Sequence, residues 1–230
     1  MRYHMATNFP LDNFTYIQYV SLWRKREMRR TKEDAALTRA QLLDAALKCF
    51  REKGYVNTTL DDIAQRTGTT RGAIHWHFGN KAQLFNTMVR ERYAQVATLF
   101  QDVFAHDETP LQQLRHFLIR WITCVEENSD FRTLLELLSF KVEMVPELAE
   151  GMQEKVQGFR ATRDMLAALI QRGIAAGEIR AEINPQTAAL AALGMANGIT
   201  SLWLMDSTSF SLRPVAEDSV DLFLRSLTGA

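Results

Sequence analysis

The sequence predicts an all-α protein of about nine helices. Apolar residues recur at helical spacing along most of the 230 residues, and no alternating stretch is long enough to predict a strand. Proline and glycine divide these helices: Pro110 and Pro185 stand at expected helix starts, whereas Gly54 and Gly68 stand at expected ends. A hydrophobic content of 47% with 23% charged residues is typical of a globular chain that buries a substantial core.

The first predicted helix covers about 33–53 and ends at Gly54. Its core stripe comprises Leu42, Leu43, Ala46, Leu47 and Phe50. Cys49 lies beside this stripe, where a packed thiol is more common than a reactive one.

A helix-turn-helix is predicted within 58–81. Leu60, Ile63 and Ala64 share one face of a helix at 60–66, and Thr59 with Asp62 forms a variant capping box ahead of it. Gly68 can take the left-handed conformation that ends this helix, and Thr70 caps the next, at 71–78. Two short helices joined by a tight turn at this spacing are typical of DNA-binding heads.

Six further helices follow in order. A long helix runs from residue 80 or 81 toward 104, and Pro110, Ser129 and Pro146 mark the next three starts. The pairs Asn184-Pro185 and Arg213-Pro214 begin the last two.

The net charge of zero conceals an asymmetry along the chain. Residues 24–81 contain 13 basic and 7 acidic side chains, whereas residues 82–230 contain 13 basic and 19 acidic ones. A basic front with an acidic back indicates a polyanionic partner at one end only, although six surplus charges alone are often a solvated face. The coincidence with the helix-turn-helix favours DNA.

The pattern Thr59-Leu60-x-x-Ile63-Ala64, Gly68, then Thr70-Arg71-Gly72-Ala73-Ile74-x-Trp76-His77-Phe78-x-x-Lys81 resembles the DNA-binding signature of the TetR family of bacterial repressors. The preceding run RTKEDAALTRAQLLDAALKCF and the later layout resemble its AcrR-type branch, which controls multidrug efflux pumps. This resemblance covers about residue 29 to the C-terminus. It implies domains at 29–82 for DNA binding and at 83–230 for ligand binding and dimerisation.

Recognition is expected on the helix at 71–78. Arg71 can pair two donors with guanine, and the small Gly72 and Ala73 allow close approach and contact with a thymine methyl. Phosphate contacts that fix the register are expected from hydroxyls and one ammonium group. The predicted DNA-binding residues are Thr58, Thr59, Thr70, Arg71, Gly72, Ala73, His75, Trp76, His77 and Lys81.

Histidine at position 75 departs from the family, which usually has tyrosine there, so DNA affinity is expected to depend on pH. Trp76 and His77 have an alternative role in packing between helices. His75 and His77 diverge on a helix, so no metal site is expected, and no cofactor. No catalytic arrangement stands out, which predicts that the protein is not an enzyme.

The resemblance also implies an apolar pocket for small hydrophobic or aromatic ligands, although periodicity alone favours an ordinary core. The candidates are Phe117, Leu118, Trp121, Leu135, Ser139, Phe159, Thr162, Leu193 and Ala196. Cys124 is a poor candidate for an oxidant sensor because no basic residue is its neighbour in the sequence.

The last two helices are expected to form a homodimer interface as a four-helix bundle, or else to pack within one subunit. The candidates are Ala188, Ala192, Gly198, Leu222 and Phe223. Two cysteines and no apolar run of about 18 residues favour the bacterial cytoplasm, with the protein on the nucleoid and not in a membrane.

Residues 1–28 form a predicted extension without clear periodicity, disordered or upstream of a true start at Met28. An alternative is a DNA-binding arm along phosphates or in the minor groove. The basic residues that would form this arm are Arg24, Lys25, Arg26, Arg29 and Arg30.

The sequence and the resemblance together thus predict a repressor of a multidrug efflux system that leaves a palindromic operator when it binds a small hydrophobic molecule. The alternatives are a DNA-binding regulator without ligand control, a regulator of lipid or aromatic metabolism, and an enzyme with an all-α cavity.

Overall fold

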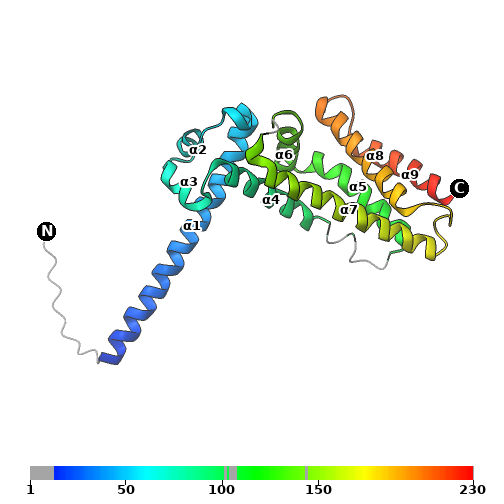
Figure 1. Cartoon of the computed structure of the whole chain (residues 1–230). Coiled ribbons are helices and arrows are strands. Elements are labelled where there is room, and N and C mark those ends of the chain that lie inside the picture. Colours follow the sequence, from blue (N-terminus) through cyan, green and yellow to red (C-terminus); the bar gives the residue numbers. More distant parts are fainter. Residues whose placement is uncertain (1–12, 101–102, 104–107, 143–144, 230) are drawn as a thin grey trace.

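The computed structural model describes the backbone of residues 13–100, 103, 108–142 and 145–229, and side chains from residue 33 onward. Within these ranges every regular element is helical, which confirms the all-α class (Figure 1). The elements are α1 Asn13–Asn57, α2 Leu60–Thr67, α3 Arg71–Phe78, α4 Lys81–Thr98, α5 Pro110–Glu127, α6 Ser129–Phe140, the 3₁₀ turn η2 Pro146–Leu148, α7 Ala149–Ala175, α8 Pro185–Met205 and α9 Leu212–Thr228.

Three boundaries differ from the prediction. Helix α1 begins at Asn13, before the expected start at residue 33, because no proline or glycine interrupts residues 13–53. Helix α4 ends at Thr98 and not near 104. Pro146 begins η2, so α7 starts at Ala149. The extension prediction for residues 1–12 lies outside the described residues.

Gly54 interrupts α1 as expected but does not end it. Its φ of 77° is a left-handed conformation that other residues rarely adopt, and one more turn follows to Asn57. A Cβ at this position would lie 3.2 Å from the backbone oxygen of Lys141, just after α6. This glycine therefore allows the end of α1 to approach the end of α6.

The DNA-binding head packs around α1. Leu42, Phe50 and Tyr55 of α1 are buried together with Ile63 of α2 and Ile74 of α3. The Tyr55 ring contacts the rings of Phe50 and Phe85, with centroids 5.6 and 5.0 Å apart. Burial of these large apolar side chains is the main force that orients α2 and α3 on α1.

Helices α5, α7, α8 and α9 form the body, and α4 and α6 lie between it and the head (Figure 1). Arg115 of α5 donates two hydrogen bonds to Asp221 of α9, at 2.6 and 3.0 Å. The carboxylate of Glu178 accepts from the amide of Leu111 at 2.9 Å and so holds the start of α5. The body is therefore fixed by a helical core with a few directional polar contacts at its edge.

Candidate nucleic-acid interface

The start of α2 is held by the predicted capping box. The Thr59 hydroxyl accepts from the amide of Asp62 at 3.1 Å, and the Asp62 carboxylate accepts from the amide of Thr59 at 2.8 Å. Lys53 of α1 donates to the same carboxylate at 2.5 Å. The Lys53 hydrogen bond, followed by those from Thr59, holds the pKa of Asp62 well below its usual range.

Gly68 ends α2 with a φ of 67°, which confirms the predicted left-handed cap. The hydroxyl of Thr70 then accepts from the amide of Ala73 at 3.2 Å and begins α3. These local hydrogen bonds set the turn between the two helices.

Helix α3 buries one face and exposes the other. Ile74 and Phe78 are buried, one turn apart, against the rest of the head. Arg71, Gly72, His75 and Trp76 are exposed, and the Trp76 side chain retains 75% of its accessible surface. An exposed indole of this size on a short helix indicates a surface that meets a partner.

Arg71 is available for such contacts. Its guanidinium lies 3.7 Å from the carboxylate of Asp61, and both side chains are more than half exposed. An exposed ion pair of this kind contributes little to stability, so it can yield to a base or phosphate contact.

His77 is half-buried, which favours its alternative role in packing. Its ring lies edge-on to Trp76, with centroids 4.5 Å apart. Burial, with a smaller contribution from the positive charge of Arg39, lowers the pKa of His77. Ala73 is also half-buried, so the exposed face of α3 centres on Arg71, His75 and Trp76.

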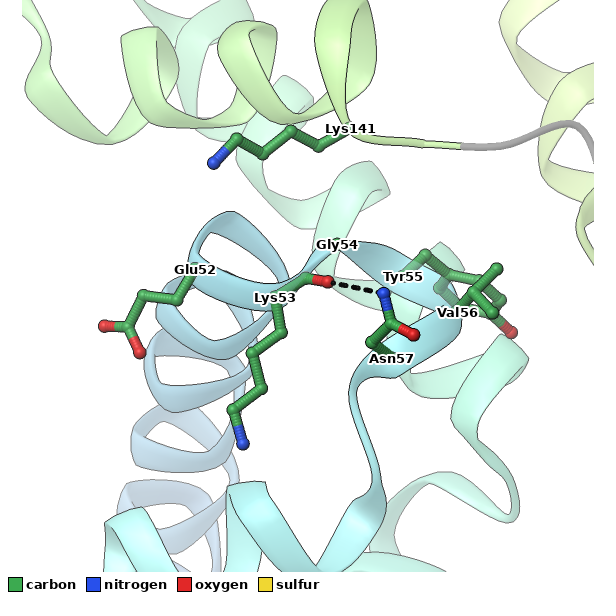
Figure 2. A pocket seen from close by; sticks show the side chains of 7 residues that line it. All are labelled: Glu52, Lys53, Gly54, Tyr55, Val56, Asn57 and Lys141. Atoms are coloured by element: carbon green, nitrogen blue, oxygen red, sulfur yellow. Dashed lines mark hydrogen bonds between the residues drawn. The ribbon is translucent and has the colours of Figure 1, made fainter.

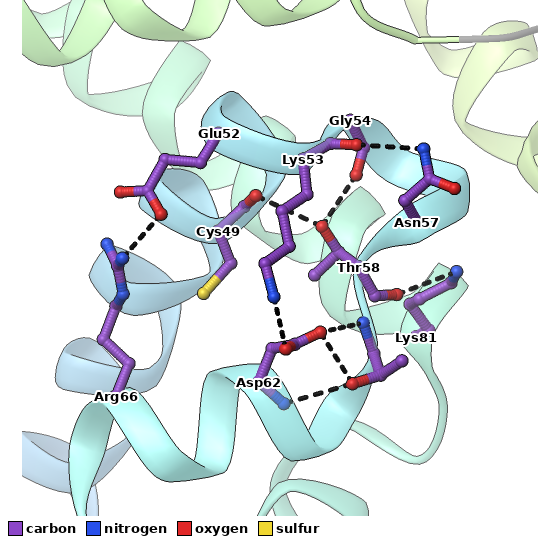
Figure 3. A network of polar contacts seen from close by, with 10 residues as sticks. Cys49, Glu52, Lys53, Gly54, Asn57, Thr58, Asp62, Arg66 and Lys81 are labelled. Carbon is purple, nitrogen blue, oxygen red and sulfur yellow. Dashed lines mark hydrogen bonds and ion pairs between the residues drawn. The ribbon is translucent and has the colours of Figure 1, made fainter.

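Thr58 and Lys81 are the first and last residues of the predicted helix-turn-helix, and they contact each other (Figure 3). Thr58 is only 1% exposed and its hydroxyl donates to backbone oxygens of α1, which does not favour the predicted phosphate contact of this side chain. The Lys81 ammonium group donates to three backbone oxygens at 3.0–3.2 Å. This arrangement does not favour the predicted contact of Lys81 with phosphate.

One residue of this arrangement was not predicted. Tyr55 supplies a carbonyl oxygen to Lys81, and its ring centroid lies 4.5 Å from the Lys81 ammonium nitrogen. Because Tyr55 follows Gly54, it lies beyond the expected helix end, where helical spacing gives no signal.

The nine predicted ligand residues differ in exposure. Phe117, Leu118, Leu193 and Ala196 are buried in the core. Trp121, Leu135 and Thr162 are half-buried, and Ser139 and Phe159 are exposed. The rings of Phe100, Phe117 and Trp121 contact one another, with centroids 5.3–5.9 Å apart. These contacts pack Phe117 and Trp121 of α5 against Phe100, which lies just after α4.

Two hollows in the described part of the chain lie elsewhere. One of about 280 Å³ is formed by the end of α1, residues 52–57, with Lys141 after α6 (Figure 2). A second of about 90 Å³ lies between α1 and α4 and is lined in part by Arg39, Met88 and Arg92. Neither is lined by any predicted ligand residue. Among the described residues, no three His, Cys, Asp or Glu side chains gather as a metal site.

Helix α8 divides its residues between two faces. Ala188 and Ala192 are 7% and 0% exposed within the subunit, which favours the alternative that these two residues pack inside one subunit. Leu190, Gly194 and Gly198 lie on the opposite, exposed face. This face continues through Leu202 and Met205, which are 63% and 72% exposed.

Helix α9 adds Leu222, which is 69% exposed, whereas Phe223 is half-buried. A Cβ at Gly194 or Gly198 would meet no atom within 4 Å, so another helix could approach there. We call Leu190, Gly194, Gly198, Leu202, Met205 and Leu222 the exposed apolar face; four of these six residues are large apolar side chains open to solvent.

By length and composition alone, α8 is also the one helix among the described residues that could cross a membrane. In its most apolar window, 39% of the residues are buried inside the structure. A helix that packs one face in a core and offers the other to a partner meets the same criterion, because both faces are then apolar.

The chain matches two protein-family models. Residues 42–88 match the model described as "Bacterial regulatory proteins, tetR family", and residues 109–228 match "MAATS-type transcriptional repressor, C-terminal region". The first match contains α2, α3 and the start of α4. The second contains the body from the start of α5 to the end of α9.

Individual relatives agree with this. The probable acrEF/envCD operon repressor of Escherichia coli is 35% identical over 205 residues, which cover 86% of this chain and 90% of the relative. The crystal structure of NalD, the secondary repressor of the MexAB-OprM multidrug efflux pump in Pseudomonas aeruginosa, is 28% identical with a TM-score of 0.75, and the match covers 85% and 98% of the two chains. The SmeT–triclosan complex is 27% identical with a TM-score of 0.66, covering 84% and 92%.

Proposed function

Because this chain belongs to the TetR family of bacterial transcriptional regulators, we propose that it is a repressor of a multidrug efflux system that small hydrophobic molecules release from its operator. Members of the family regulate transcription and are not enzymes. The observation that carries the proposal is the exposed face of α3, which presents Arg71, His75 and Trp76 to solvent. The opposite face of α3 is anchored by the buried side chains of Ile74 and Phe78.

In the proposed complex α3 lies in the major groove. Arg71 reads guanine through two donors, and Gly72 lets the helix backbone approach the base edges. Thr70 lies at the exposed start of α3, where its hydroxyl accepts from the amide of Ala73 and can donate to a phosphate oxygen. Thr59 is also exposed, but its amide and hydroxyl donate to Asp62, so a phosphate contact would have to replace one of these bonds.

The exposed apolar face of α8 and α9 supports a homodimer. Two copies that pack these faces would cover Leu202, Met205 and Leu222 in both subunits at once, as two-fold symmetry requires. A dimer places two copies of α3 about 34 Å apart on successive turns of a palindromic site. We propose that this dimer acts in the bacterial cytoplasm, at the nucleoid.

The proposed ligand site lies between α5, α6, α7 and α8. The similarity to NalD, a repressor of a multidrug efflux pump, supports efflux control. The similarity to SmeT in its complex with triclosan supports a small hydrophobic ligand. Phe117 and Trp121 of α5 pack against Phe100 just after the end of α4, so a ligand that reaches this side of α5 must move these rings. A ligand that reverses a 1:99 equilibrium must prefer the released form by about 5.5 kcal/mol.

The test is a mobility-shift titration with DNA from upstream of the protein's own gene, repeated with a panel of hydrophobic drugs that includes triclosan. The proposal predicts a complex at nanomolar protein that dissociates with at least one drug. A complex that none of the drugs dissociates would contradict the proposed ligand control but not the proposed DNA binding.

A second candidate function is DNA-binding regulation without a ligand. The contacts among Phe100, Phe117 and Trp121 favour it, because a packed core offers no preformed pocket. Calorimetric titration with the same drugs separates the two candidates, since a protein of this second kind binds none of them.

A further inference from the structure

The end of α1 is closed by the side chain of Lys81. The last four carbonyl groups of a helix have no partner within it, and here the Lys81 ammonium nitrogen lies 3.0 Å from the oxygen of Tyr55 and 3.2 Å from that of Val56. It lies 3.1 Å from the oxygen of Thr58, the residue that leads into α2. An ammonium group has three N–H donors, so these contacts can use all of them.

The acceptors of Lys81 are themselves held in place. The Thr58 hydroxyl is 2.7 Å from the oxygen of Gly54 and 3.2 Å from that of Cys49, and its amide donates to the oxygen of Tyr55 at 3.3 Å. Thr58 is almost completely buried, so its hydroxyl has no access to water or DNA. These bonds turn the Thr58 carbonyl toward Lys81 (Figure 3).

Lys81 also has favourable electrostatic surroundings. Its nitrogen lies 4.5 Å from the centroid of the Tyr55 ring, where the face of the ring attracts a cation. A cation near the last carbonyl groups of a helix also interacts favourably with the helix dipole. The Tyr55 ring in turn packs against Phe85 of α4, 5.0 Å away.

We propose that Lys81 is a positioning residue that clips the two ends of the helix-turn-helix together and does not bind phosphate. Thr58 and Lys81 are the first and last residues of the segment 58–81, so their contact fixes both ends of α2 and α3 relative to α1. Because Lys81 is also the first residue of α4, any tilt of α4 would move α3 with it.

This inference rests on the proposed DNA-binding function, but it makes a separate prediction about salt. Each phosphate contact that is lost lowers the dependence of log affinity on log salt by about 0.9 for duplex DNA. A phosphate-binding lysine lost from both subunits would therefore lower the slope by about 1.8. A positioning lysine would leave the slope unchanged while specific affinity falls.

The experiment compares Lys81→Met, Lys81→Arg, Thr58→Val and Lys48→Met with the wild type in the full-length protein. Fluorescence anisotropy measures the affinity for the upstream fragment and for random duplex. The salt concentration is varied between about 50 and 200 mM, a range in which a protein that makes several phosphate contacts loses orders of magnitude in affinity. Lys48→Met is the matched control, because Lys48 is an exposed lysine of α1 and its loss removes the same charge.

We expect Lys81→Met to weaken binding to the upstream fragment by about tenfold or more, with the salt slope and random-duplex affinity equal to those of Lys48→Met. Thr58→Val, which removes no charge, is expected to change specific binding in the same direction. Lys81→Arg keeps a cation with several donors and should retain more specific affinity than Lys81→Met. Amide hydrogen exchange in α2 and α3 should accelerate in Lys81→Met and Thr58→Val but not in Lys48→Met.

Two results would overturn the positioning role proposed for Lys81. A slope lowered by about 1.8 in Lys81→Met, with equal losses on both DNAs, would make Lys81 a phosphate contact. Affinity and exchange identical to those of Lys48→Met would show that the three hydrogen bonds have no positioning role. If Lys81→Met does not fold, Thr58→Val and Lys81→Arg decide the question with the same two measurements. Failure of the wild type to prefer the upstream fragment would instead contradict the proposed function.

Discussion

Arg92 of α4 lies 3.3 Å from the carboxylate of Asp130 on α6, and the same guanidinium contacts Asp44 of α1. One side chain thus joins α1 of the head to α4 and α6, the two helices between the head and the body. The Arg92 side chain is 12% exposed, whereas both carboxylates are more than half exposed. A ligand that moves α6 would have to break or redirect this contact before the head could move.

Replacement of Arg92 by methionine should lower the free energy of unfolding by about 1–2 kcal/mol, because two charge-assisted contacts of a mostly buried guanidinium are lost. Urea unfolding followed by circular dichroism measures the change. Arg90→Met is the matched control, since Arg90 is 58% exposed and its ion pair with Glu154, at 3.3 Å, lies at the surface. Equal losses in the two variants would mean that the Arg92 contacts add nothing beyond an ordinary surface pair.

Arg71→Ala should cost roughly 1–3 kcal/mol at one base position of the operator, since a bidentate contact with guanine is lost. Anisotropy titrations against an operator and its single-base variants locate that position. A uniform loss across all sequences would make Arg71 a phosphate contact.

Leu222→Asp should convert the protein to a monomer, because it places a charge within the apolar face that the two subunits are proposed to share. Light scattering after size-exclusion chromatography measures the mass. Leu37→Asp serves as the control, since Leu37 is 60% exposed on α1, away from that face. If both variants keep the same mass as the wild type, the interface lies elsewhere or the protein is already a monomer.

Phe159 and Phe117 should respond differently to alanine. Phe117 is 4% exposed, so Phe117→Ala should cost about 3–5 kcal/mol of stability. Phe159 is 44% exposed, so Phe159→Ala should cost less than about 1 kcal/mol but weaken triclosan binding. Calorimetry for binding and urea unfolding for stability are the two measurements; unchanged triclosan affinity in Phe159→Ala would exclude Phe159 from the site.

Cys124 should be unreactive in the native protein. Burial raises the pKa of its thiol to about 12, and its sulfur donates to the backbone oxygen of Trp121 at 3.1 Å. A raised pKa keeps the thiol protonated at pH 8, so a thiol-specific dye should label it only after denaturation. Rapid labelling of the folded protein would instead indicate an accessible, redox-active thiol.

The local parts of the head could be predicted from sequence. Thr59, Gly68 and Thr70 set their caps through neighbours within four residues, and the structure places each cap as expected. The contact of Lys81 with Tyr55 and Thr58 spans 26 and 23 positions. Only packing of α1 against α4 brings these residues together, so sequence spacing could not reveal it.

The body shows why apolar spacing is not sufficient. In α8 both faces consist of small or apolar residues, so the sequence could not tell that Ala188 and Ala192 face the core while Gly194 and Gly198 face outward. Apolar spacing could not define the predicted pocket either, because a large apolar residue such as Phe117 fits the pattern of a packed core as well as that of a ligand site. The start of α1 at Asn13 was missed because an aromatic-rich stretch without periodicity can still be helical when nothing interrupts it.

The central claim is that the exposed face of α3 reads specific duplex DNA from a dimer. The direct measurement is an anisotropy titration of the wild-type protein with its own upstream fragment in excess random competitor at moderate salt, with the bound mass determined in parallel. The account predicts nanomolar binding by two subunits, at least about 10³-fold tighter than random duplex. Equal affinity for both DNAs, or binding by a single subunit, would contradict it.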